Sequence, residues 1–152
     1  MNNVFSMLLR VRYNECDAQE VVFNARYGDY VDIAVTEYMR TLFGGYQELL
    51  AQGIDWQVVR LATDWKSSAQ FDDVLAISVV TAAVGNTSFT LHVNISDYST
   101  GREIAQSEIV NVAVTPVNHE KMSIPDDFRA KLQEGAPGVL VNYSGINTED
   151  DI

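Results

Sequence analysis

The sequence contains a single cysteine, Cys16, among its 152 residues. One thiol cannot form a disulfide within the chain, and so few cysteines are typical of a reducing compartment. No basic segment followed by an apolar run opens the chain, so no signal peptide is predicted. No apolar stretch is long enough to cross a bilayer. These absences predict a cytoplasmic protein without membrane insertion.

Positive charge is also scarce, because 10 lysines and arginines stand against 21 acidic residues and the formal net charge is −11. Nucleic acid and anionic membranes attract basic surfaces, so this balance argues against both as partners. A phosphorylated small molecule needs only a few well-placed cations. The available cations include Arg26, Arg60, Lys66, Arg102 and Lys121.

The motifs of several enzyme classes are missing as well. The two histidines, His92 and His119, lack metal-ligand spacing, and the sequence has no Cys-x-x-Cys or acidic metal cluster. It has neither a Gly-x-Ser-x-Gly elbow nor a glycine-rich phosphate loop, which argues against serine hydrolases and nucleotide hydrolases. No metal or other cofactor is therefore expected.

The length predicts one domain, residues 1–134, followed by an acidic C-terminal tail, residues 135–152, which we expect to be a loose end. Residues 5–13 alternate like a half-buried strand, and steps of three and four predict a long amphipathic helix from Tyr27 to Phe43. Further helical turns are predicted over 46–52 and 125–132. Strands are predicted over 55–67, 74–84, 87–98 and 103–115. This order predicts an α+β fold in which an antiparallel sheet wraps around one long central helix.

The segment from Arg12 to Tyr27 is the most informative about function. A carboxylate, Asp17, follows a strand and closely precedes a helix start, where free N–H groups can bind an oxygen that gains negative charge. The pattern resembles the signature of the hotdog-fold acyl-CoA thioesterases of the 4-hydroxybenzoyl-CoA thioesterase family. The residues that carry this resemblance are Tyr13, Glu15, Asp17, Val21, Val22, Phe23 and Tyr27.

The resemblance implies hydrolysis of a small or medium acyl-CoA, with Asp17 as nucleophile or general base. The sequence does not separate these two routes. The backbone N–H near Asn24 is the expected oxyanion donor, while the Asn24 side chain is equally consistent with a helix cap. Further residues are expected to bind substrate or coenzyme A: Tyr27, Arg60, Lys66, Ser67, Thr87 and Ser88.

The chain departs from the family pattern at two places. Gln19 and Glu20 stand where the family often has glycine, which would affect the turn after Asp17. Asn24 replaces a histidine found in many relatives. Two alternatives therefore stay open, a non-catalytic acyl-CoA-binding hotdog protein and a hydratase or dehydratase of acyl thioesters. The lack of a histidine near Asp17 argues against the hydratase. Cys16 lacks the base and the positive surroundings that a nucleophilic thiol needs, and strand alternation is expected to turn it away from Asp17.

The predicted fold also has implications for assembly. One helix cannot cover both faces of the sheet, and an edge strand leaves backbone groups unpaired. The resemblance implies pairing of subunits edge to edge, as a homodimer or homotetramer, with the site between subunits.

Overall fold

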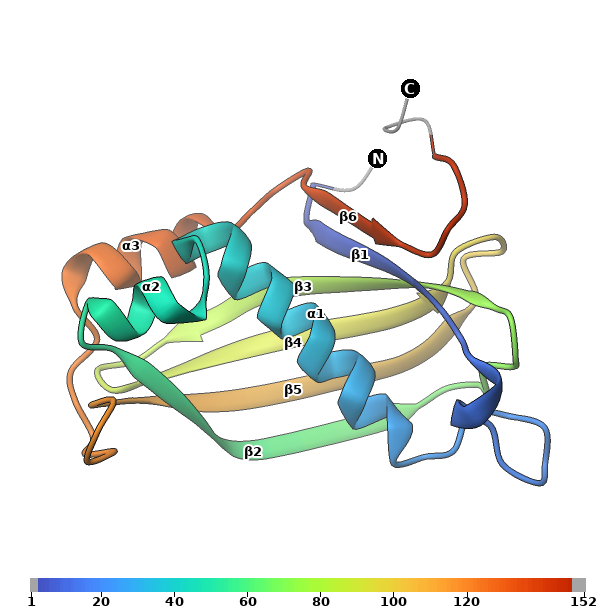
Figure 1. The fold of residues 1–152 in the computed structure, drawn as a ribbon, viewed down its shortest axis with the longest axis horizontal. Helices are drawn as coiled ribbons and strands as arrows, with labels where there is room; N and C mark the ends of the chain where they lie inside the picture. Colours follow the sequence, from blue (N-terminus) through green and yellow to red (C-terminus); the bar gives the residue numbers. More distant parts are fainter. Residues whose placement is uncertain (1–2, 149–152) are drawn as a thin grey trace.

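A single mixed sheet organises the computed structural model, which describes residues 3–148. The strand order is β2-β5-β4-β3-β1-β6, and α1 crosses one face of this sheet (Figure 1). The strands are β1 (Phe5–Arg10), β2 (Asp55–Trp65), β3 (Val74–Val84), β4 (Ser88–Asp97), β5 (Glu103–Val114) and β6 (Leu140–Tyr143). The helices are η1 (Tyr13–Glu15), α1 (Arg26–Phe43), α2 (Tyr46–Ala51) and α3 (Asp126–Glu134). The predicted α+β class is confirmed.

The long helix α1 follows its predicted bounds closely. It ends at Gly44, which has a φ of 89° and donates its N–H to Arg40 O over 2.8 Å. Glycine suits this left-handed stop because it has no Cβ to clash. The buried face of α1 packs against β3 and β1, and its side chains share one hydrophobic core with the apolar side chains of β4. That face is formed by Tyr27, Tyr30, Val31, Ala34, Val35, Tyr38, Met39 and Phe43.

Helix α1 shares the sheet with a second helix, α3, which packs against β3 and α1. Phe128 of α3 stacks on Phe43 of α1, with ring centroids 4.3 Å apart, and approaches Phe89 of β4 edge-on. Both α3 and α2 lie at the C-terminal end of α1 (Figure 1). The core under this end of the sheet therefore depends on α3 as well as on the long helix.

Strand β6 corrects the expectation that residues 135–152 form a loose end. It pairs in parallel with β1, with Ser6 opposite Leu140, so the sheet is mixed rather than purely antiparallel. The segment after β6 also returns to β1, where Arg10 Nε donates to Ser144 O over 3.0 Å. The acidic residues 149–151 lie outside the described residues.

Strand β1 is more buried than its alternating pattern predicted. Ser6 and Leu8, which alternate with the core residues Phe5 and Met7, are themselves only 4% and 1% exposed. The reason is long-range, because β6 and the residues after it lie beside β1. Tyr13 is 81% exposed, since β1 ends at Arg10 and Tyr13 belongs to the short helix η1.

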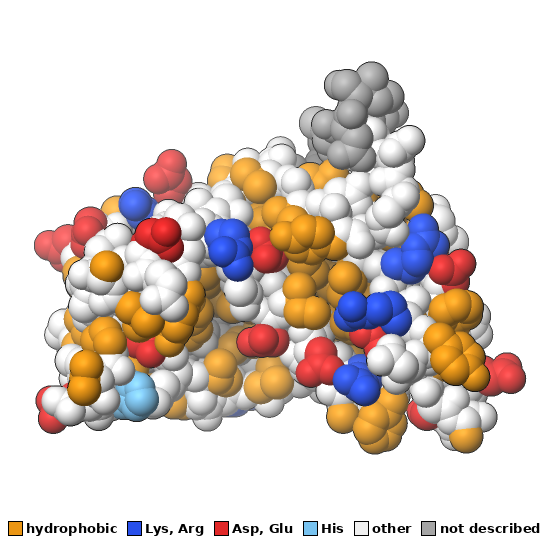
Figure 2. Space-filling view, in the orientation of Figure 1, with side chains coloured by type: hydrophobic (Ala, Val, Ile, Leu, Met, Phe, Trp, Pro, Cys, Tyr) orange, Lys and Arg blue, Asp and Glu red, His pale blue; other side chains and the backbone are white. Residues whose placement is uncertain are grey.

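The opposite edge of the sheet is β2. It exposes several large apolar side chains, among them Val58, Val59, Leu61 and Trp65. Hydrophobic side chains gather in several patches on the face that carries α1, between acidic and basic ones (Figure 2). Surfaces of this kind commonly mark protein interfaces.

Candidate active site

Asp17 lies in the loop between η1 and α1. This loop leads into the N-terminal end of α1 (Figure 1). The N–H of Asp17 donates to Val21 O over 2.9 Å, and its carbonyl accepts the N–H of Glu20 over 3.0 Å. Cys16 and Val22 pair as an isolated antiparallel bridge at the base of this loop. The loop closes completely without glycine.

Glu20 occupies the position in this loop where glycine would be most favourable. Its φ is 65°, in the left-handed region. A residue with a Cβ pays about 1–2 kcal/mol to adopt this conformation. The glycine missing from the sequence signature therefore appears as local backbone strain at Glu20.

The Asp17 side chain is held from one side and open on the other. Oδ1 accepts the N–H of Gln19 over 2.8 Å, which fixes the carboxylate in the loop. Oδ2 accepts no hydrogen bond from any residue that the structure describes. The half-buried Asp17 lines a cleft of about 470 Å³. The other residues that line this cleft are Tyr13, Cys16, Glu20, Gln70 and Phe71.

Two exposed aromatic rings flank the cleft. Tyr13 and Phe71 meet edge to face with their centroids 5.9 Å apart. Cys16 lines the same cleft, so the expectation that it points away from Asp17 is wrong. Burial, followed by the charges of Glu15 and Asp17, raises the pKa of the Cys16 thiol. A raised pKa disfavours the thiolate, which supports the interpretation that Cys16 is not a nucleophile.

Glu15 is a buried acid that connects the start of the Asp17 loop to helix α1. Its side chain is only 5% exposed, and Oε1 accepts the N–H of Arg12 over 2.7 Å and the hydroxyl of Tyr30 over 3.0 Å. Burial and the nearby Glu15 raise the pKa of Tyr30. Glu15 therefore ties η1 to α1. Glu15 was part of the sequence signature, but the sequence assigned it no function. Its partner Tyr30 follows Tyr27 by three residues and lies on the same buried face of α1.

Asn24 lines a second cavity, of about 250 Å³, on the other side of the loop. Within residues 3–148 its N–H donates to no protein acceptor. The helix start has Ala25 as its N-cap and lacks a side-chain cap hydrogen bond, so the alternative interpretation of Asn24 as a helix cap is not supported. The cavity brings together four of the predicted site residues, namely Asn24, Tyr27, Lys66 and Ser67.

Tyr27 forms the buried floor of this second cavity. It is 2% exposed, and its hydroxyl accepts the N–H of Ala69 over 3.2 Å. Its ring lies edge-on to Trp65 and to Tyr30, at 5.8 Å in both cases. Burial raises the pKa of its hydroxyl. Tyr27 is thus a core residue with a part that borders the cavity.

Three further predicted binding residues lie elsewhere within one chain. Arg60 pairs with Glu108 over 2.6 Å, and Glu108 also bonds His92 over 3.2 Å. Thr87 and Ser88 stand at the other end of the sheet, because Ser88 pairs with Val112 of β5 whereas Trp65 pairs with Ala105. None of the three lines either cavity beside the Asp17 loop.

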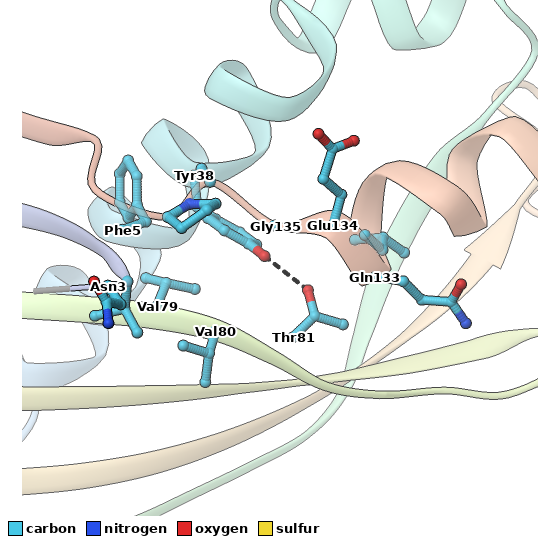
Figure 3. Close-up of a pocket in the computed structure, with 13 residues that line it drawn as sticks. Asn3, Phe5, Tyr38, Val79, Val80, Thr81, Gln133, Glu134 and Gly135 are labelled. Carbon is cyan, nitrogen blue, oxygen red and sulfur yellow. Dashed lines mark hydrogen bonds between the residues drawn. The ribbon is translucent and has the colours of Figure 1, made fainter.

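A small cavity of 130 Å³ lies between α1, α3 and β3 (Figure 3). The hydrogen bond between the Tyr38 and Thr81 hydroxyls, 2.8 Å long, crosses it. It contains none of the predicted site residues and is not a candidate active site. Within the described chain, no cluster of three His, Cys, Asp or Glu side chains is arranged for a metal ion. None of its helices is long and apolar enough to cross a membrane.

Comparison with known proteins places these features in context. The family model of the thioesterase-like superfamily matches residues 11–132. This range includes all residues that line the Asp17 cleft and the Asn24 cavity. The acyl-CoA thioesterase YbgC of Haemophilus influenzae is 39% identical over 85 residues, covering 55% of this chain and 62% of that protein. The acyl-CoA thioester hydrolase YbgC of Escherichia coli O157:H7 is 24% identical over 131 residues, covering 86% and 97%.

Solved structures show the same architecture. The 1,4-dihydroxy-2-naphthoyl-CoA thioesterase from Synechocystis superposes with a TM-score of 0.76 at 15% identity, covering 85% of this chain and 95% of that one. At this identity the likeness concerns the fold. It supports the α+β fold independently of the signature around Asp17.

Proposed function

The chain belongs to the thioesterase-like superfamily and has its hotdog fold, and from this premise we propose that it hydrolyses the thioester bond of acyl-CoA substrates. The main support within the chain is the Asp17 carboxylate. One of its oxygens is fixed by the loop, and the other is open to a cleft of about 470 Å³. A cleft of this volume suits a small or medium acyl group.

In the proposed reaction, Asp17 Oδ2 either attacks the thioester carbonyl carbon or takes a proton from the water that does so. The carbonyl oxygen becomes an oxyanion, which accepts a hydrogen bond from the Asn24 N–H. The C–S bond then breaks, and coenzyme A leaves as the thiolate. If Asp17 attacks directly, an acyl–Asp17 mixed anhydride remains, and water hydrolyses it to the free acid and the Asp17 carboxylate; if Asp17 activates water, the free acid forms in the same step. The products are the free acid and coenzyme A on either route.

The reacting group has to reach both Asp17 and Asn24, which line different cavities of one chain. We propose that a second subunit, lying against β2, completes the site between them. Lys66 and Ser67 border the Asn24 cavity and are proposed to bind the coenzyme A portion. Arg60, Thr87 and Ser88 stay predictions for a site shared between subunits, and so does the cytoplasmic location.

The experiment that tests this function is thiol release from a panel of acyl-CoAs by the wild-type protein and Asp17→Asn. We expect the variant to melt near the wild-type temperature and to lose about a hundredfold or more in kcat, the typical contribution of a positioned acid or base. Asp29→Asn is the matched control, because this exposed acid of α1 pairs only with Arg26 among the described residues. It should keep full activity.

Two results would contradict the proposal in different ways. Wild-type rates in a folded Asp17→Asn variant would remove Asp17 from the mechanism. No thiol release by the wild-type protein from any acyl-CoA would instead favour a non-catalytic acyl-CoA-binding protein.

A further inference from the structure

Residues 66–71 form a wall segment that both cavities share. Residues 66–68 line the cavity of Asn24, and residues 70–71 line the cleft of Asp17. The segment follows the end of β2 and is not itself part of a helix or a long strand. Its start is anchored to β5, where the N–H groups of Lys66 and Ser67 donate to Ile104 O over 2.7 and 3.2 Å. The position of the rest depends more on the groups that contact it.

One side chain, Arg102, holds this wall segment from outside. Its Nη1 donates to Ser67 Oγ over 2.5 Å and to Ser68 O over 2.9 Å. Its Nη2 lies 3.8 Å from Asp73 Oδ2, and the same Asp73 oxygen accepts the N–H of Gln70 over 2.9 Å. Arg102 thus reaches the wall directly at two residues and through Asp73 at a third.

The wall segment in turn positions the residues of the candidate site. Ala69 donates its N–H to the Tyr27 hydroxyl over 3.2 Å and accepts the N–H of Val22 over 2.9 Å. Val21, at the end of the Asp17 loop, forms an isolated antiparallel bridge with Gln70. A shift of the wall would consequently move both the loop that carries Asp17 and the floor of the second cavity.

We propose that Arg102 is a positioning residue for thioester hydrolysis, an inference that rests on the function proposed above. It lines neither cavity, so it acts through the wall segment rather than by touching substrate. Arginine suits this role because its planar fork presents several donors in fixed directions, whereas lysine offers one compact charge. Loss of the guanidinium is expected to loosen residues 66–71 on both sides of the Asp17 loop.

The test compares Arg102→Ala and Arg102→Lys with a matched arginine control, Arg129→Ala. Arg129 of α3 also donates to a backbone carbonyl, that of Val84, but at the other end of the sheet. Arg102→Ala should lower kcat at least tenfold, since small misplacements of reacting groups cost up to about a hundredfold. Arg102→Lys should restore part of this loss, and Arg129→Ala should match the wild type.

Hydrogen exchange followed by mass spectrometry gives a second readout that needs no activity. Peptides covering residues 66–71 should exchange faster in Arg102→Ala and at the wild-type rate in Arg129→Ala. If Arg102→Ala does not fold, the smaller change in Arg102→Lys has to show both effects in reduced form.

The outcomes separate this inference from the proposed function. Faster exchange with undiminished kcat would show that Arg102 holds the wall without serving the reaction, and would overturn the inference. Unchanged exchange would overturn it as well. A wild-type protein without thioesterase activity but with Arg102-dependent exchange would show that the proposed function had failed while the structural role of Arg102 stood.

Discussion

At the scale of single residues, we propose that Asn24 contributes through its backbone rather than through its side chain. Its N–H stands at the start of α1 and donates to no acceptor within the described residues. The dipole of an 18-residue helix adds positive potential at the same point. Replacing the histidine of many relatives with asparagine leaves this donor intact.

This view of Asn24 leads to a graded prediction. Asn24→Ala keeps the N–H and should change kcat little. Asn24→Pro removes the donor, and proline is tolerated at the start of a helix. The proline variant should lose at least about tenfold in kcat, a modest figure beside the usual loss of one oxyanion donor.

Steady-state kinetics on acyl-CoA, together with thermal melting, checks the prediction for Asn24. A well-folded proline variant of undiminished activity would place the oxyanion at another donor. A large loss in the alanine variant would point to the side-chain amide instead.

The residues of the site differed in how far the sequence could predict them. Asp17 and Asn24 could be proposed from the sequence because a local signature surrounds them. From the sequence, Arg102 could be named only as one cation among several, since its bonds to Ser67 and Ser68 join residues 35 and 34 positions away. The missing glycine near Glu20 indicated that the turn after Asp17 would be affected. The positive φ angle of 65° at Glu20 itself became evident only in the folded structure.

At the scale of elements, the turn between β4 and β5 carries Arg102 and depends on a buried acid. Asp97 is 8% exposed and accepts hydrogen bonds from Thr100 Oγ1 over 2.6 Å and Ser99 Oγ over 3.1 Å. The bond from Thr100, then those from Ser99, and the charge of Arg102 lower the pKa of Asp97. The turn is therefore stabilised by an ionised carboxylate.

A pH dependence of stability follows from this lowered pKa. The folded value lies below the unfolded one of about 3.9, so the contribution of Asp97 is fully present above that pH. It is lost as the pH falls through the folded pKa. Asp97→Asn should be less stable than the wild type at pH 7, and the difference should shrink below about pH 4.

Denaturant unfolding between pH 7 and pH 3 measures this effect. The control is Glu120→Gln, an exposed acid in the loop between β5 and α3, which should follow the wild-type curve. Parallel curves for Asp97→Asn and the wild type across this range would contradict the prediction.

The elements also show where sequence patterns stop being informative. Helix α1 and strand β4 have strong local periodicity, β2 alternates loosely, and β3 is rich in β-branched residues. The bounds of α1 and of β2 to β5 in the structure lie close to the predicted ones. Strand β6 was missed because it is four residues long and follows a segment with proline and glycine. Its partner is β1, more than 130 positions away in the chain, and no local pattern records that pairing.

At the scale of the whole molecule, the open edge at β2 predicts association. The strand offers an unpaired row of backbone groups next to exposed apolar side chains such as Val59 and Leu61. We expect light scattering at micromolar concentration to give the mass of two or four chains rather than 16.9 kDa.

A charge on that edge should separate the subunits. Val59→Lys is expected to shift the protein towards monomer and to lower thioesterase activity, because the proposed site needs two chains. Val117→Lys is the control, since Val117 is 87% exposed in a loop outside β2. A monomeric wild type, or a monomeric Val59→Lys variant of full activity, would contradict the shared site.

The two edge strands of the sheet differ in length, and this difference limits how many chains can join the sheet edge to edge. β2 offers 11 residues for pairing, whereas β6 offers four at the opposite edge. Very short edge strands are poor templates for another chain. If two molecules join through β2, the outer edges of the combined sheet are the two short β6 strands, which are poorly suited to pairing with a further chain. In this sense the last strand of the chain acts as a terminator, because removing it would expose the six-residue strand β1 as a longer edge that another chain could pair with.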